Sequence, residues 1–168
     1  NPEFLTASTA YEDFKNQEFI ILGGEVNVAK KVKKIYEVAF PNSKYHLTDS
    51  ITAETVKYTI NNFLALKVSF ANEIYRLCES LKIDYNDMIN MASEDSRLGQ
   101  SHWMVPGHDG SFGYGGSCFP KDVSALYAKM NALNVPSYII KACLKRNVEL
   151  DRSEKDWELL RGRAISDN

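Results

Sequence analysis

The strongest constraint on the fold is a long helical pattern in the middle of the chain, from about residue 53 to residue 81. Apolar side chains recur there at the spacing of one helical stripe. They are Val56, Ile60, Phe63, Leu64, Val68, Ile74, Leu77 and Leu81. Leu66 and Phe70 lie off this stripe, so the helix is apolar over much of its circumference. Such a helix needs burial on more than one side, which a partner subunit would provide.

A βαβ unit is predicted ahead of the long helix. Residues 18–24, EFIILGG, are a short apolar run that ends at a glycine pair, which is typical of a buried strand. Residues 25–40 predict a helix, and residues 44–50 a second strand. The expected apolar stripe of this helix is Val28, Val32, Ile35, Val38 and Ala39. Two strands make no stable sheet, and the chain begins with Asn1, so further strands are expected upstream.

The rest of the chain reads as helices around one long loop. Residues 96–116 are rich in glycine and aromatic residues and have no periodicity, and long loops in compact domains are usually functional. Pro120 suits the first turn of a following helix. The predicted helices span about 85–95, 119–133 and 138–150. In the charged tail, Trp157, Leu159 and Leu160 could dock onto the domain.

Composition narrows the class of protein. The 168 residues suffice for a proper core, and a net charge of −2 offers nothing to attract nucleic acid or a membrane surface. The longest apolar run is too short to span a bilayer. Three cysteines without repeated spacing argue against a disulfide framework and favour a reducing compartment, the cytoplasm. The three histidines are not spaced as metal ligands, so no metal is expected.

Residues 113–122, GYGGSCFPKD, hold the most reactive candidate, Cys118. A thiolate is the nucleophilic form of cysteine, and a helix N-terminus favours negative charge. Lys121 is close in sequence, and glycines let the backbone approach a ligand closely. The alternative is a small buried hydrophobic residue, which also suits Cys78 and Cys143 within amphipathic helices. Asp122 falls in the first predicted turn, where an acid by itself is more often a helix cap than a catalyst.

Three further polar positions have two interpretations each. Lys57 and Asn61 share one face of the long helix, where they could meet a ligand oxygen or form a solvated edge. Arg97 could bind an anion or be a surface charge. Glu3, in the apolar stretch NPEFL, carries no signal by itself.

Taken together, these motifs resemble the UDP-glucose/GDP-mannose dehydrogenase family. The stretches NPEFL, ETVKYTINNFLALKVSFANEI, SRLG and FGYGGSCFPKDVSAL occur in the family's order, and GGSCFPKD is highly specific. The resemblance covers the chain to about Glu149. It implies a mainly α fold, with a 6-phosphogluconate-dehydrogenase C-terminal-like helical domain around a long central helix. Residues 1–50 would be the end of an NAD-binding Rossmann domain, and residues 51–168 the central dimerisation domain.

The resemblance also implies a double oxidation of a nucleotide sugar, from C6 alcohol to carboxylate, with two NAD. Cys118 would be the nucleophile that forms a thiohemiacetal and then a thioester. Lys57 and Asn61 would stabilise charge on the oxygen at C6. Asp122 would hold a water and assist proton transfer, and Glu3 would be the general acid/base.

Other positions are implied to contact the ligands. Residues expected to line the substrate site are Phe4, Leu5, Arg97, Ser111, Phe112, Gly113, Tyr114, Gly115 and Gly116. Arg97 would reach the substrate of the neighbouring subunit of a homodimer. Cys118, Phe119 and Lys121 would face the nicotinamide. The sequence departs from the family at Ala7, where a carboxylate that touches NAD is missing, and in residues 100–110, where His102 and Trp103 either contact substrate or pack.

Two classes of function stay open. The chain is either part of an NAD-dependent oxidoreductase or a non-catalytic dimerisation module or enzyme remnant. Survival of Cys118, Lys57, Asn61, Asp122 and Glu3 together favours the enzyme. UDP-glucose is the leading substrate, with GDP-mannose and UDP-N-acetyl sugars as alternatives. The chain lacks a GxGxxG motif, so these residues are expected to be inactive by themselves.

Overall fold

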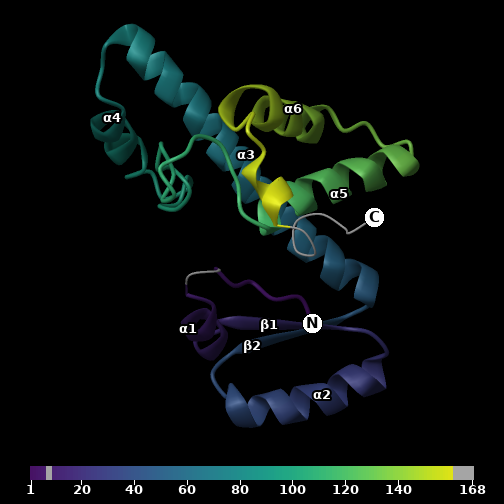
Figure 1. Ribbon diagram of the computed structural model, residues 1–168. Helices are drawn as coiled ribbons and strands as arrows, with labels where there is room; N and C mark the ends of the chain where they lie inside the picture. Colours follow the sequence, from purple (N-terminus) through teal and green to yellow (C-terminus); the bar gives the residue numbers. More distant parts are fainter. Residues whose placement is uncertain (7–8, 161–168) are drawn as a thin grey trace. The chain divides into compact units, whose positions relative to one another are not determined.

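The computed structural model describes residues 1–6 and 9–160, and it is mainly helical, as predicted. The chain divides into two compact units, Asn1–Ile60 and Asn61–Asn168. The elements of Figure 1 are α1 (Ala10–Lys15), β1 (Phe19–Gly23), α2 (Val26–Ala39), β2 (Lys44–Thr48), α3 (Ser50–Leu81), α4 (Tyr85–Ala92), α5 (Cys118–Ala132) and α6 (Tyr138–Arg146). A π-helical turn (Asn147–Asp151) and a 3-10 turn (Asp156–Leu159) follow α6.

The first unit contains the predicted βαβ unit. Strands β1 and β2 are parallel, with Phe19 opposite Lys44 and Gly23 opposite Thr48, and α2 connects them (Figure 1). The three central residues of β1 are buried, as expected for a strand covered on both faces. Ile20 and Leu22 pack with the helix to form the core of this unit.

The predicted apolar face of α2 is wrong, except at Val32. Val28, Ile35 and Val38 are exposed by 57%, 70% and 85%. The face that packs on the sheet instead carries Ala29, Val32, Tyr36 and Phe40. The rings of Tyr36 and Phe40, whose centres are 5.9 Å apart, contribute large apolar area to this packed side.

The long helix is confirmed, and its start has a physical cause. Asp49 precedes it and accepts hydrogen bonds from the backbone N–H and the hydroxyl of Thr52, at 2.9 and 2.6 Å, which is the arrangement of an N-cap. Within one chain α3 buries mainly small and polar positions, such as Ala65, Ser69 and Asn72.

The second unit packs α4, α5 and α6 with α3 around two apolar clusters. Ala65, Tyr114, Val123 and Cys143 form the first. Ala71, Cys78, Tyr85 and Val105 form the second. The predicted helices and the aperiodic loop between α4 and α5 are confirmed, and Trp157 docks as expected with 8% of its surface exposed. Leu159 does not dock, since it is 85% exposed.

Candidate functional site

The candidate nucleophile lies at the start of a helix. Cys118 is the first residue of α5, and its thiol is exposed, with Ser117 Oγ 3.8 Å from Sγ. The buried-hydrophobe interpretation is therefore wrong for Cys118, whereas Cys78 and Cys143 are buried, as expected. Gly116 precedes the helix with a φ of 68°, a conformation that glycine adopts without strain. A small ligand could reach this thiol from solvent.

One turn further along α5, Asp122 is buried in a polar network. Its side chain is 3% exposed; one carboxylate oxygen accepts from Asn61 Nδ2 at 2.6 Å, and Lys121 Nζ donates to the other. Because α5 starts at Cys118, Asp122 lies beyond its first turn, and the prediction of a first-turn cap acid is wrong. Asn61 is only 6% exposed, so it does not belong to a solvated edge. The structure thus brings Asn61, Asp122 and Lys121 together.

Glu3 and Lys57 meet in the first unit. Lys57 Nζ donates to the backbone oxygen of Glu3 and lies 5.4 Å from the centre of the Phe4 ring. Phe4 in turn packs against Phe19, with ring centres 5.0 Å apart. The contact holds the NPEFL stretch by its backbone and leaves the exposed Glu3 at the surface. Ala7 lies outside the described residues.

Two asparagine side chains hold the backbone of the glycine-rich segment before Cys118. Gly113 N donates to Asn72 Oδ1 at 3.1 Å, and Tyr114 N to Asn147 Oδ1 at 2.8 Å. Asn147 Nδ2 donates to Tyr114 O at 2.9 Å, so the amide pairs both backbone groups of one residue. These two asparagines were missed from the sequence, although each interrupts an otherwise amphipathic helical pattern.

The other predicted ligand-binding residues have contacts of their own. The Phe112 ring packs 5.5 Å from that of Tyr75, and Tyr114 is buried in the core, which raises the pKa of its hydroxyl. Arg97 is exposed, and its guanidinium pairs with Asp95. Leu5, Ser111 and Phe119 are partly buried, Gly115 is half-buried, and Gly116 is exposed. Any substrate contact of these residues stays a prediction.

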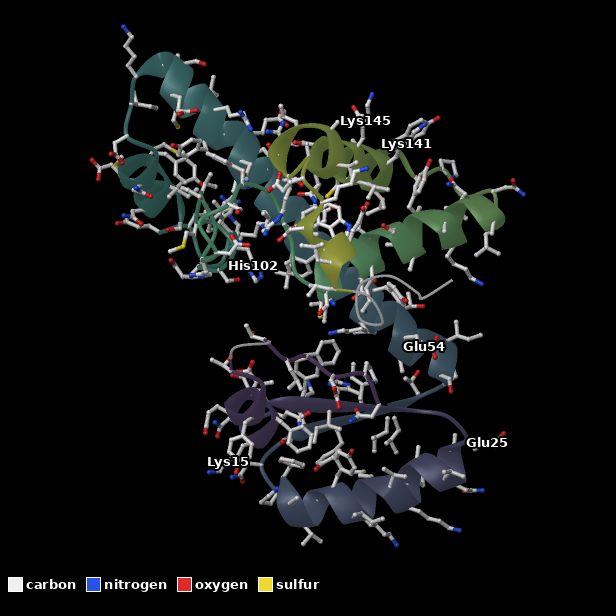
Figure 2. The ribbon with its side chains drawn as sticks, in the orientation of Figure 1. Lys15, Glu25, Glu54, His102, Lys141 and Lys145 are labelled. Carbon is white, nitrogen blue, oxygen red and sulfur yellow. The ribbon has the colours of Figure 1, made fainter. Side chains whose placement is uncertain are left out.

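The loop between α4 and α5 is pinned by a lysine. Lys67, 9% exposed, donates to the backbone oxygens of Leu98 and Gly99 at 2.7 and 3.2 Å, and its ammonium lies 4.5 Å from the Trp103 ring centre. Trp103 therefore packs. The ring of His102, labelled in Figure 2, is tilted by 45° to that of Phe119, with the ring centres 5.8 Å apart. Burial, helped by the charge of Lys67, lowers the pKa of His102.

Two other kinds of site are not seen in residues 1–6 and 9–160. No helix in these ranges combines the length and the apolar character that a membrane span requires. The same residues contain no cluster of three or more histidine, cysteine or acidic side chains that could hold a metal ion.

The fold and the site define the class of protein. It has a helical domain built on one long helix after a βαβ unit, with an accessible thiol at the start of another helix. The family follows from comparison with known sequences. Residues 51–149 match the UDP-glucose/GDP-mannose dehydrogenase family, central domain, and the chain belongs to this family.

Individual relatives agree with this assignment. A UDP-glucose 6-dehydrogenase of Rickettsia felis is 36% identical over 149 residues, which are 88% of this chain and 32% of that protein. One of Bos taurus is 35% identical over 141 residues, 81% of this chain and 28% of the relative. A solved UDP-glucose dehydrogenase of the archaeon Pyrobaculum islandicum aligns with a TM-score of 0.79 and 35% identity, over 88% of this chain and 33% of that one. The chain thus spans about a third of the length of these relatives.

Proposed function

We propose that the chain belongs to a nucleotide-sugar 6-dehydrogenase that oxidises UDP-glucose to UDP-glucuronate with NAD, through a covalent intermediate on Cys118. The observation that carries this proposal is the exposed thiol at the first residue of α5, followed by a buried carboxylate that holds Asn61. The names of the similar proteins support the reaction and the substrate. The alternative, an idle dimerisation module, gives no reason for this pair to be kept buried beside an accessible thiol.

In this proposal Cys118 forms and breaks one carbon–sulfur bond. Its thiolate attacks the carbon of the C6 aldehyde and gives a thiohemiacetal. Loss of hydride from that carbon gives a thioester. Water then adds to the thioester, the carbon–sulfur bond breaks, and the products are a carboxylate and the free thiol. The aldehyde is never released, because the sulfur holds it between the two oxidations.

Charge develops on the C6 oxygen in each addition step, and the proposal assigns Asn61 and Lys57 to stabilise it. The Asn61 side chain is oriented by its bond to Asp122, which leaves the amide fixed before the reaction. Asp122 would also hold the attacking water, and Glu3 would act as general acid/base in hydrolysis. The exposed position of the Glu3 side chain leaves it free for proton exchange with solvent.

The described residues suit the nicotinamide end of NAD but not its pyrophosphate. The chemistry that bound NAD supplies is acceptance of hydride, once from the alcohol and once from the thiohemiacetal. The exposed Cys118, with Phe119 and Lys121 beside it, is compatible with the nicotinamide. The turn between β1 and α2 is short, and an acidic residue, Glu25, precedes the helix. This turn does not fit a pyrophosphate, because a carboxylate there would repel the phosphates.

The substrate class has a second candidate. A GDP-mannose dehydrogenase of Pseudomonas aeruginosa, solved as a ternary complex, aligns with a TM-score of 0.53 and 28% identity, over 92% of this chain and 34% of that one. The higher identity and TM-score of the UDP-glucose dehydrogenase favour UDP-glucose. UDP-N-acetyl sugars remain a third possibility for the assay.

The test is NADH formation at steady state. The protein is expressed with any adjoining coding sequence and given NAD and each sugar nucleotide, with Cys118→Ser beside it. We expect about two NADH per UDP-glucose and a loss of at least about 1,000-fold in the serine variant, whose hydroxyl is a far weaker nucleophile. Absence of NADH with every sugar nucleotide, or full activity of Cys118→Ser, would contradict the proposal.

The proposal includes a homodimer through α3. Phe63, Phe70 and Leu77 recur every seven residues on this helix and are 65%, 53% and 50% exposed. Phe70 also lines a groove of about 540 Å³ between α3 and α6 that Ile139 and Leu150 share. Lys145 of α6, labelled in Figure 2, also lines this groove. A second copy of the helix would cover these apolar side chains. Arg97 as a ligand of the neighbouring subunit's substrate, the domain boundary after residue 50 and the cytoplasmic location remain predictions.

A further inference from the structure

The backbone of the glycine-rich segment lies directly on the residues that follow α6. A Cβ atom placed on Gly113 would come within 2.3 Å of Asn147 Oδ1 and 3.0 Å of Asp151 Cβ. A Cβ atom on Gly115 would lie 2.3 Å from Arg152 Cζ. The two distances of 2.3 Å are far below van der Waals contact, and that of 3.0 Å is also too short. Glycine is therefore required at these positions for close approach to the 147–152 segment.

Arg152 links three parts of this region. Its side chain is only 4% exposed. One nitrogen, Nη2, donates to Asp109 Oδ2 at 2.6 Å and to Asp156 Oδ2 at 2.7 Å, while Nε donates to Asp156 Oδ1 at 2.7 Å. A buried guanidinium that is paired with two carboxylates has few alternative positions, because each change would leave a charge without a partner.

The helical turn next to the segment has an unusual geometry, and its first residue, Asn147, binds the loop backbone at Tyr114. Residues Asn147–Asp151 form a π-helical turn, and Arg152 N donates to Asn147 O at 2.8 Å. Asp151 is held in turn by Arg146 and Arg76, at 2.8 and 3.3 Å. Such wide turns are rare and often occur at functional sites. This turn supports a loop rather than a ligand.

We propose that Arg152 is a positioning residue for Cys118. Its guanidinium fixes Asp109, in the second half of the loop, and packs against Gly115, three residues before the thiol. The loop is thereby held at both ends of its 109–115 stretch, and α5 begins from a fixed point. The role in catalysis rests on the proposed function, whereas the role in holding the loop does not. The proposal also gives a role to Asp109, which lies in the stretch 100–110 that the sequence analysis left without a role.

The sharpest perturbation is Asp109→Asn. Asparagine keeps the Oδ1 acceptor for the backbone N–H of Ser111, which is 3.0 Å away, and puts an NH2 donor in place of the Oδ2 acceptor that faces Arg152, so both the charge and this hydrogen bond are lost. The pair of Arg152 with Asp156 remains, so the variant is expected to fold. Glu37→Gln is the matched control, since it makes the same chemical change in an exposed ion pair with Lys33 on α2. Arg152→Lys is the second variant, because lysine keeps the charge and loses the fork.

The readouts are amide hydrogen exchange in residues 109–118 and the rate of Cys118 alkylation by iodoacetamide, measured by mass spectrometry. We expect Asp109→Asn and Arg152→Lys to speed exchange in this segment by about ten-fold, while exchange in α3 stays unchanged. The alkylation rate constant should change by at least about five-fold, with the buried Cys78 and Cys143 still protected. In the active protein, kcat should fall by about ten- to hundred-fold with a smaller change in KM, since a misplaced nucleophile loses transition-state geometry.

The results can be assigned without ambiguity. If both variants match Glu37→Gln in exchange and alkylation, Arg152 does not position the loop, and the inference is wrong. If Cys118→Ser keeps full NADH formation, the proposed function fails, while the exchange and alkylation rates still decide whether Arg152 holds the segment.

Discussion

Replacement of Asn147 by alanine should destabilise the second unit strongly. Asn147 is fully buried, and its side-chain amide pairs both the N–H and the C=O of Tyr114, at 2.8 and 2.9 Å. Alanine offers neither a donor nor an acceptor, so both backbone groups of a buried residue would lose their partners. Tyr114 is itself 3% exposed, and water reaches it poorly.

The size of the effect follows from these two lost bonds. Leaving one buried backbone group unpaired costs about 1–3 kcal/mol, so the pair costs roughly 2–6 kcal/mol. Small domains have a total free energy of unfolding of about 5–15 kcal/mol. With a urea dependence of about 2 kcal/mol per molar, the unfolding midpoint should fall by roughly 1–3 M.

Tryptophan fluorescence during urea titration reports unfolding of the second unit, which contains Asn147. The protein has two tryptophans, Trp103 and Trp157, and both belong to the second unit. Asn90→Ala is the control, because Asn90 is exposed on α4 and alanine suits a helix. If the urea midpoint of Asn147→Ala equals that of the control, the two hydrogen bonds contribute nothing to stability. The explanation that Asn147 holds the loop backbone at Tyr114 is then refuted.

Two further predictions concern the pH dependence of stability, through the buried His102, and dimer formation, through the exposed Phe70. Burial lowers the pKa of His102 below its ordinary value near 6.5, so the unfolded chain binds the proton more readily and stability is lost as the pH falls through that value. The urea midpoint of the native protein should therefore drop between about pH 7.5 and about pH 5.5, and it should drop less in His102→Gln, while the exposed-site control His46→Gln behaves like the native protein. Phe70→Glu should weaken the proposed dimer by at least about 100-fold in light scattering after size-exclusion chromatography, because a carboxylate would be buried between apolar side chains. Val38→Glu, at a residue that is 85% exposed on α2, should leave the oligomeric state unchanged, and a monomeric native protein would disprove the dimer.

The helices and strands could be read from the sequence because their signals are local. The periodicity over residues 53–81 predicts α3, and the run EFIILGG predicts β1. The face of α2 could not be read in the same way. Lysines and β-branched residues alternate around this helix, and only contact with the sheet selects Tyr36 and Phe40 as the packed side.

In the candidate site, too, features with local signals could be predicted and features that depend on distant residues could not. Cys118 stands out in the sequence because glycines, a proline and a helix start surround it, and those signals lie within ten residues. The supports of the loop do not stand out, because Asn72 and Asn147 lie 41 and 33 residues from the backbone groups they bind. A polar residue in a helical pattern looks the same whether it faces water or a buried amide.

The order of the elements and the position of the candidate thiol could be derived from the sequence alone, since both depend on neighbours along the chain. Only the tertiary structure decided that Asp122 is buried against Asn61 and that Arg152 lies behind Gly115. These partners are brought together by the packing of α3, α5 and the segment after α6. Packing depends on the summed shape and polarity of whole surfaces, and no single stretch of residues contains that information.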